Sequence, residues 1–92
     1  MSYTISKYTL EKAKLLDVDV KNSTNKNKKI DVFKNGIKLC SIGAIKYMDY
    51  TMYLKTDKLN AEKRRVLYHQ RHKKDIEKKK YSPGWYASVL LW

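Results

Sequence analysis

The 92-residue chain has one cysteine, one proline, three glycines and no long apolar run. Because Cys40 has no intramolecular partner, a disulfide-stapled secreted domain is excluded and a reducing compartment is favoured. The N-terminal residues lack the continuous apolar segment of a signal peptide. No stretch approaches the roughly 20 apolar residues that cross a bilayer. We therefore expect one domain, residues 1–92, that is neither secreted nor membrane-spanning.

Acidic residues are also scarce, since nine Asp and Glu stand against 21 Lys and Arg, a formal net charge of +12. Such a potential favours a polyanionic partner: nucleic acid, an acidic protein face or anionic lipid. Residues 57–80 alone hold ten Lys and Arg and four Asp and Glu, a formal charge of +6. This concentration favours a binding role over the alternative that the excess lysine serves solubility alone.

Motifs that carry chemistry are missing as well. There is no Gly-rich phosphate loop and no CxxC or HExxH spacing. His69 and His72 lie beside cations, and Cys40 sits alone in a predicted strand. Asp17 and Asp19 share a strand face without the third acidic group of a metal cradle. We predict a non-enzymatic protein with no catalytic residue, metal or cofactor.

The segment "LLDVDVK", residues 15–21, alternates apolar and polar side chains. A period of two predicts a strand with one buried face, formed by Leu16, Val18 and Val20. The polar segment "NSTNKNKK" that follows is typical of a loop.

A β-hairpin is predicted by Asn35-Gly36 between two β-prone runs, because both residues tolerate the positive φ of a type I′ turn. In the register of a two-residue loop, one face carries four aliphatic residues: Ile30, Val32, Ile37 and Leu39. The opposite face carries Asp31, Phe33, Lys38, Cys40 and Ile42. With residues 15–21 as a neighbour, the sequence predicts a three-stranded antiparallel meander over residues 15–44.

Residues 57–80 contain no Gly or Pro and are rich in helix-forming residues, which predicts one long basic helix. Asp57 or Asn60 would be its N-cap. Its thin apolar stripe, Leu59, Val66 and Leu67, would be buried, and we expect fraying beyond residue 72. The N-terminal segment, residues 1–14, predicts one or two helical turns from Ser6 or Thr9, and residues 45–56 an irregular connection.

The uncharged segment "SPGWYASVLLW", residues 82–92, predicts a short helix with Ser82 as N-cap and Pro83 at the first helical position. Trp85, Val89 and Trp92 would share a buried face. The alternatives are a platform for stacking bases and an interfacial membrane helix, which would lack cations on its polar face. The predicted fold class is therefore α+β: the meander, a long basic helix and a short C-terminal helix.

The basic helix is the richest candidate site. At 100° per residue Arg64, Tyr68, Arg71 and Lys78 lie on one side, with His72 beside them, a combination suited to phosphate contacts and stacking. A structural alternative is that the two arginines pack over the tyrosine and pair with an acidic neighbour, Asp75. The predicted nucleic-acid-binding residues are Lys26, Lys28 and Lys29 before the hairpin and Arg64, Arg65, Tyr68, Arg71, His72, Lys73, Lys74, Lys78 and Lys79 in the helix.

Three ordered stretches, "KKIDVFKNGIKLCSIGAIKYMDYT", "RRVLYHQRH" and "SPGWYASVLLW", carry a resemblance over residues 22–92. The chain resembles a family of small basic proteins of unknown function, encoded by large DNA viruses of algae and amoebae and by cyanobacterial tailed phages. It departs from them at residues 52–58, where "MYLKTDK" replaces a His-Lys-Asp run, so no role of that histidine transfers. The resemblance implies a viral gene product acting in the host cytoplasm or nucleus, or in the virion.

These observations lead to a non-enzymatic viral protein that binds nucleic acid, DNA or RNA, through phosphate contacts. The alternative is a structural virion component, a minor capsid or cement protein, whose basic face docks on an acidic capsid surface. A third reading is an inhibitor that mimics a cationic partner of a host factor.

Overall fold

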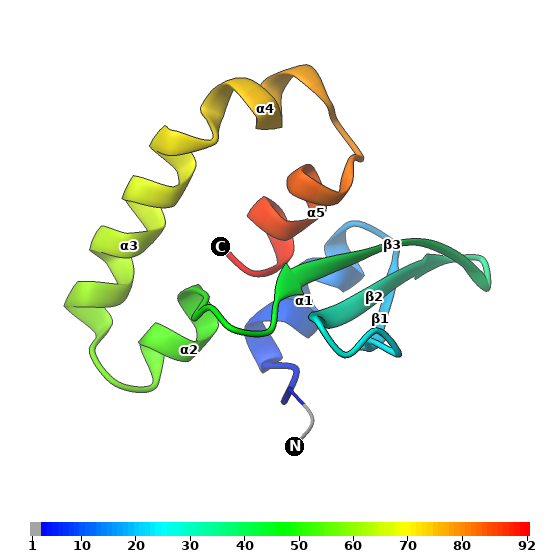
Figure 1. Cartoon of the computed structure of the whole chain (residues 1–92), viewed down its shortest axis with the longest axis horizontal. Helices are drawn as coiled ribbons and strands as arrows, with labels where there is room; N and C mark the ends of the chain where they lie inside the picture. Colours follow the sequence, from blue (N-terminus) through cyan, green and yellow to red (C-terminus); the bar gives the residue numbers. More distant parts are fainter. Residues whose placement is uncertain (1–2) are drawn as a thin grey trace.

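The computed structural model describes residues 3–92, which form one three-stranded antiparallel sheet and five helices (Figure 1). The elements follow the order α1 (Lys7–Leu15), β1 (Asp19–Asn22), β2 (Lys28–Lys34), β3 (Ile37–Ala44), α2 (Tyr50–Leu54), α3 (Lys58–Arg71), α4 (Lys73–Lys78) and α5 (Pro83–Leu90). The predicted α+β class is confirmed, with a meander in the order β1-β2-β3, a 14-residue basic helix and a C-terminal helix. None of the described helices is long and apolar enough to cross a membrane.

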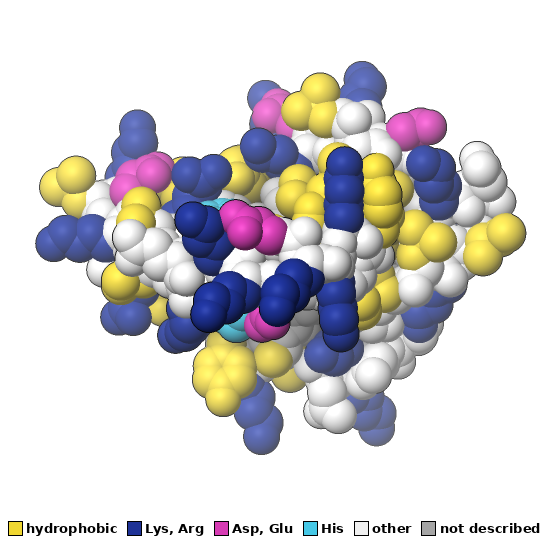
Figure 2. All heavy atoms as spheres, turned by 90° about the horizontal axis from the view of Figure 1, so that it is seen from above, with side chains coloured by type: hydrophobic (Ala, Val, Ile, Leu, Met, Phe, Trp, Pro, Cys, Tyr) yellow, Lys and Arg dark blue, Asp and Glu magenta, His cyan; other side chains and the backbone are white. Residues whose placement is uncertain are grey.

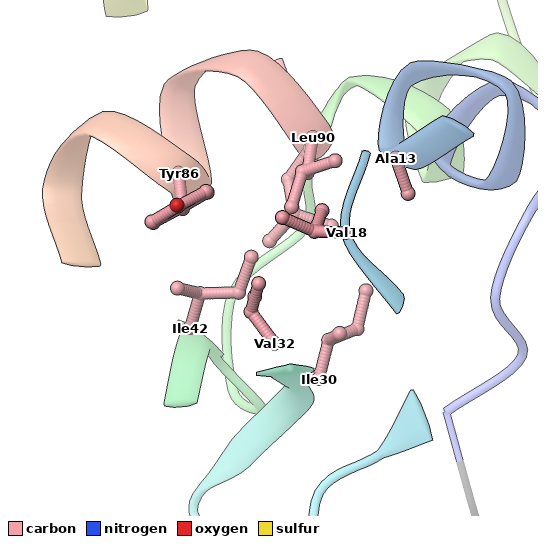
Figure 3. Close-up of a cluster of buried hydrophobic side chains, with 8 residues drawn as sticks. Ala13, Val18, Ile30, Val32, Ile42, Tyr86 and Leu90 are labelled. Atoms are coloured by element: carbon pink, nitrogen blue, oxygen red, sulfur yellow. The ribbon is translucent and has the colours of Figure 1, made fainter. Parts of the chain in front are cut away.

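Two parts of the molecule differ in their packing. The body consists of the sheet, α1 and α5, and the arch consists of α3 and α4, which curve around the C-terminal residues in Figure 1. The core of the body lies between one face of the sheet and the two helices (Figure 3). Its buried side chains are Ala13, Val18, Ile30, Val32, Ile42, Tyr86, Leu90 and Leu91.

The predicted hairpin turn is confirmed, since Asn35 and Gly36 have φ values of 52° and 79°, as a type I′ turn requires. The predicted register holds only next to the turn. Lys34 pairs with Ile37, but an irregularity follows between Val32 and Phe33.

That irregularity is a β-bulge in β3, because Phe33 pairs with Lys38 and Val32 with Cys40, which leaves Leu39 as an extra residue. An extra residue reverses the alternation of faces along its strand. The predicted aliphatic face is therefore wrong in β3. Ile42 is buried, with 2% of its surface exposed, whereas Ile37 and Leu39 are 68% and 44% exposed.

The first strand is shorter than the predicted one. Residue 15, predicted as the first residue of the strand, is the last residue of α1. The N-cap of this helix is Ser6, one of the two predicted starts, and it accepts a hydrogen bond from the Thr9 amide at 3.2 Å. The chain then turns through Asp17, with φ of 58°, before β1 begins. Val18 is still buried, so the alternation indicated the core side chain although it misplaced the strand boundary.

The predicted single helix over residues 57–80 is wrong, because the backbone breaks at His72, with φ of −101° and ψ of 7°. Asp57 is the N-cap of α3, accepting from the Asn60 amide at 3.3 Å. Beyond the break, α4 has one apolar side chain, Ile76, and α4 packs against α5. A straight helix would carry this segment away from the body.

The predicted buried stripe of α3 is also wrong. Leu59, Val66 and Leu67 are exposed, and α3 instead buries Ala61. Its small side chain allows close approach to α2, the element that α3 contacts most closely.

The C-terminal helix begins as predicted, with Ser82 accepting from the Trp85 amide at 3.2 Å and Pro83 at its start. Its buried side chains are Tyr86, Ser88 and Leu90, not the predicted set of Trp85, Val89 and Trp92. The helix ends at Leu90, so the last tryptophan lies beyond it and turns toward α3.

Candidate nucleic-acid interface

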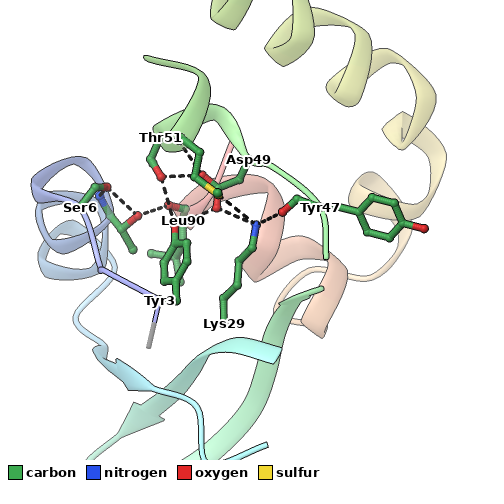
Figure 4. Close-up of polar contacts among 9 residues, drawn as sticks. Tyr3, Ser6, Lys29, Tyr47, Asp49, Thr51 and Leu90 are labelled. Atoms are coloured by element: carbon green, nitrogen blue, oxygen red, sulfur yellow. Dashed lines mark hydrogen bonds and ion pairs between the residues drawn. The ribbon is translucent and has the colours of Figure 1, made fainter. Parts of the chain in front are cut away.

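A buried ion pair joins β2 to the segment that leads into the arch (Figure 4). The Lys29 Nζ lies 3.0 Å from Asp49 Oδ2, with 3% and 1% of the two side chains exposed. The ammonium group also donates to the carbonyl oxygen of Tyr47. Lys29 was predicted to contact phosphate, and this placement corrects the prediction: its charge is held inside the protein by a carboxylate.

Asp49 collects several further donors. It is the N-cap of α2, accepting from the Met52 amide at 3.1 Å, and its other oxygen accepts from the Tyr3 hydroxyl at 2.8 Å. Burial strongly raises the pKa of Tyr3, which keeps the phenol a neutral donor. The network therefore fixes the N-terminal segment, β2 and the start of α2 against one another.

A second carboxylate, Asp31, organises the loop between β1 and β2. It accepts from the hydroxyls of Ser23 and Ser41, each at 2.6 Å, and lies 3.4 Å from the Lys38 Nζ. Burial raises the pKa of Asp31, but these hydrogen bonds and that of the Thr24 amide outweigh it and lower the pKa from 3.8 to about 2.

Lys26 and Lys28, predicted as a second set of phosphate contacts, lie just before and at the start of the hairpin. Lys26 is exposed and Lys28 is half-buried. Lys26 lies in the loop between β1 and β2 and Lys28 begins β2; Figure 1 shows this loop at the lower side of the view and α4 at the top.

An aromatic contact holds the arch to the body. The Trp92 ring stacks on Tyr68 with a centroid distance of 4.4 Å and an interplanar angle of 4°. Arg65 Nε donates to the carbonyl oxygen of Trp92 at 2.7 Å. Burial raises the pKa of the Tyr68 phenol, against the opposing charge of Arg71. Arg65 and Tyr68, predicted as ligand contacts, thus serve the joint between α3 and the C-terminal residues.

Beside this joint lies a cleft of about 540 Å³ between α3, residues 43–49 and the end of α5. Four members of the predicted side of the basic helix line it together: Arg64, Tyr68, Arg71 and His72. Lys78 does not, because the break at residue 72 turns α4 away. The cleft is also lined by Gly43, Ala44, Tyr47, Met48, Tyr53, Leu67, Ala87, Leu91 and Trp92, with Lys29 and Asp49 as further lining residues.

No Lys or Arg of the arch forms an ion pair with an Asp or Glu side chain within residues 3–92. The ion pairs there are Lys7–Glu11, Lys29–Asp49 and Lys38–Asp31, all outside α3 and α4. The alternative in which Arg71 pairs with Asp75 is therefore not found. Arg64 lies instead over the Tyr53 ring, 5.5 Å from its centroid.

The outer side of the arch is strongly basic. Lys73, Lys74, Lys78 and Lys79 are exposed. Figure 2, which looks onto the side where α4 lies in Figure 1, shows Lys and Arg side chains gathered over the middle of this face, with a few acidic groups among them.

Sequence reasoning missed the wall of the cleft that faces α3. Tyr47 and Met48 come from the segment predicted as an irregular connection, and Tyr53 from α2. The available signal was the density of tyrosine in "YMDYTMY", but nothing in that run indicates which rings are exposed.

No cluster of three or more His, Cys, Asp or Glu side chains within residues 3–92 could hold a metal ion. Cys40 is half-buried, and burial, with the nearby charge of Asp31, raises the pKa of its thiol. A raised pKa disfavours the reactive thiolate.

Comparison of the chain with protein-family models, curated proteins and solved structures finds no match. The resemblance to viral and phage proteins stays a prediction.

Proposed function

We propose that this protein binds nucleic acid without catalysing a reaction, through phosphate contacts made by the arch. The observation that supports this most directly is that Lys73, Lys74, Lys78 and Lys79, close together in the chain, are all exposed and form no ion pair with an Asp or Glu side chain within residues 3–92. An unpaired, exposed cation can release the condensed counterions of a nucleic acid on binding, which drives association.

The arch offers two kinds of contact. The exposed lysines of α4 supply a diffuse positive field that attracts any phosphate backbone irrespective of sequence. Arg64 and Arg71, which line the cleft, supply guanidinium groups suited to directed phosphate hydrogen bonds. Lys29 is buried and takes no part.

Charge reversal at two places tests this proposal. Replacing Lys73, Lys74 and Lys78 by Glu reverses charge on the arch, and replacing Lys14, Lys21 and Lys34, which are exposed in the body, is the matched control. Both variants keep a formal charge of +6, half of the +12 of the parent chain.

We expect the arch variant to lose most of its affinity for a labelled duplex and to reduce the slope of log K against log salt by about 3, one per lost phosphate contact. The body variant should keep most of the affinity and most of the salt dependence. Each single substitution should change the free energy of unfolding by under about 0.5 kcal/mol. Equal losses in the two variants would show that net charge alone matters and would refute a site on the arch.

A second candidate function is that of a structural virion component, and a specific observation favours it. A groove of about 730 Å³ is lined by Leu15, Leu39, Tyr81 and Trp85, with two cations, Lys34 and Lys80. Exposed apolar side chains flanked by lysines suit an acidic amphipathic segment of a capsid protein. In that case Leu39→Glu should abolish co-purification with emptied capsids, while the arch variant should retain it. Loss with the arch variant alone would refute this docking mode.

A further inference from the structure

We infer that the cleft beside α3 receives an unpaired nucleic-acid base that stacks on Tyr47, so that the protein prefers single strands to duplexes. The inference rests on the proposed function. It adds a bound base to the phosphate contacts, which by themselves leave the cleft empty.

Size and chemistry of the cleft fit a nucleotide. Its volume of about 540 Å³ lies within the range of about 300–1,000 Å³ typical of small-molecule sites. Its lining combines aromatic rings with Arg64 and Arg71, the pairing of stacking surfaces and cations that recurs in single-strand binding proteins. Asp49 also lines it, but Lys29 neutralises that carboxylate at 3.0 Å, which reduces its repulsion of a phosphate group.

Tyr47 has the features of a stacking platform. Its side chain is 72% exposed, while its backbone is held at both ends: its amide donates to the Ala44 carbonyl oxygen at 3.1 Å, and its own carbonyl oxygen accepts from Lys29 Nζ. Figure 4 shows the ring pointing away from the buried ion pair. Because these hydrogen bonds hold the backbone, a base that binds orders only the side-chain torsions of the ring.

The other rings of the cleft are already engaged. Tyr68 lies 4.4 Å from the Trp92 ring and 4.4 Å from the His72 ring, measured between centroids. Tyr53 lies under the guanidinium group of Arg64. Tyr47, by contrast, has no ring stacked on it and no cation over its face among the described contacts of residues 3–92. The free aromatic surface of the cleft is therefore that of Tyr47.

Three of the residues that line the cleft, Gly43, Ala44 and Ala87, have small side chains or none, which leaves room for a ligand. A Cβ on Gly43, whose φ is +78°, would lie 2.7 Å from Leu91 Cδ1 and 3.0 Å from Lys29 Cδ. The close approach of strand, lysine and leucine below the cleft thus requires glycine. Bases in a duplex are stacked on one another and paired, so a ring in this cleft can reach the face of a base only when that base is unpaired.

The test compares the affinity for a labelled oligothymidylate of about 10 nucleotides with that for a duplex of the same length, by fluorescence anisotropy. We expect Tyr47→Ala to weaken single-strand binding about 5- to 150-fold and to leave duplex binding unchanged. Tyr47→Phe keeps the ring and should restore binding. Tyr81→Ala, at an exposed tyrosine that does not line the cleft, is the matched control and should bind as the parent does.

Salt dependence separates stacking from charge. Stacking releases no counterions, so the factor lost in Tyr47→Ala should be the same at low and high salt, unlike the loss caused by charge reversal on the arch. Equal binding of strand and duplex, both unaffected by Tyr47→Ala, would overturn this inference and leave phosphate binding intact. Absence of binding to either ligand by the parent protein would overturn the proposed function itself.

Discussion

The body and the arch differ in how some of their lysines are used. In the body Lys29 is buried against Asp49, and Lys38 reaches the buried carboxylate of Asp31. In α4 the lysines are exposed, and none has a carboxylate partner among the residues the structure describes. The net charge of a small basic protein is therefore not all available for contacts with a partner. Part of it completes the fold, because Lys29 is buried against a carboxylate, whereas the lysines of α4 are exposed and close together in the chain.

The largest expected change in stability follows from replacing the buried lysine of the body, Lys29. Lys29→Met leaves the buried Asp49 carboxylate without its counter-ion, which should lower the free energy of unfolding by about 3–5 kcal/mol. Lys73→Met, the same change in the arch, should alter it by under about 0.5 kcal/mol. Urea unfolding measures both, and equal effects would erase the distinction between the two regions.

Acid should act on the body through Asp31. Because its pKa is about 2 in the folded state and 3.8 in the unfolded reference, the carboxyl binds its proton more weakly when folded. Its contribution, about 2 kcal/mol, is complete above pH of about 4 and is lost as the pH falls toward about 2.

The Asp31→Asn variant isolates this contribution. It should be less stable at neutral pH and should lose less stability on acidification than the parent, as followed by urea unfolding at a series of pH values. Parallel pH profiles for the two proteins would contradict the assignment.

The smallest expected effect concerns the joint between the two regions. Trp92→Ala removes the ring stacked on Tyr68, which should make local opening of α3 easier by about 1 kcal/mol and raise amide exchange there about five-fold. Amides of β2 should exchange at an unchanged rate, and Trp92→Phe should show a smaller change in α3. If α3 and β2 respond together, the arch and the body form one cooperative unit rather than two.

Features set by neighbouring residues were predictable from the sequence. The positive φ values of Asn35-Gly36 define the hairpin turn, and Ser82 followed by Pro83 defines the start of α5. In each case the physical cause lies within a few residues of the chain, so the signal is local.

Features that depend on distant partners were not predictable. Lys29 looks like any loop lysine until Asp49, 20 residues further on, is placed beside it. The bulge at Leu39 has no sequence signal, yet it moves Ile42 into the core and leaves Leu39 exposed. The face that α3 buries follows from its contact with α2 rather than from its own apolar residues.

The residues of the candidate site also fall into a predictable and an unpredictable group. Helical periodicity placed Arg64, Tyr68 and Arg71 on one side of α3, and the structure has them line one cleft. Tyr47 on the facing wall could not be assigned, because its exposure depends on hydrogen bonds to Ala44 and Lys29 that only the folded chain makes.

The bulge at Leu39 also has a consequence for contacts between copies of this protein. β3 is an outer strand of the sheet and carries exposed aliphatic side chains, a combination that invites a neighbouring molecule to add a strand. A bulge interrupts the even spacing of amide and carbonyl groups that such an addition needs. The bulge therefore protects the exposed edge of the sheet against pairing between copies at high concentration.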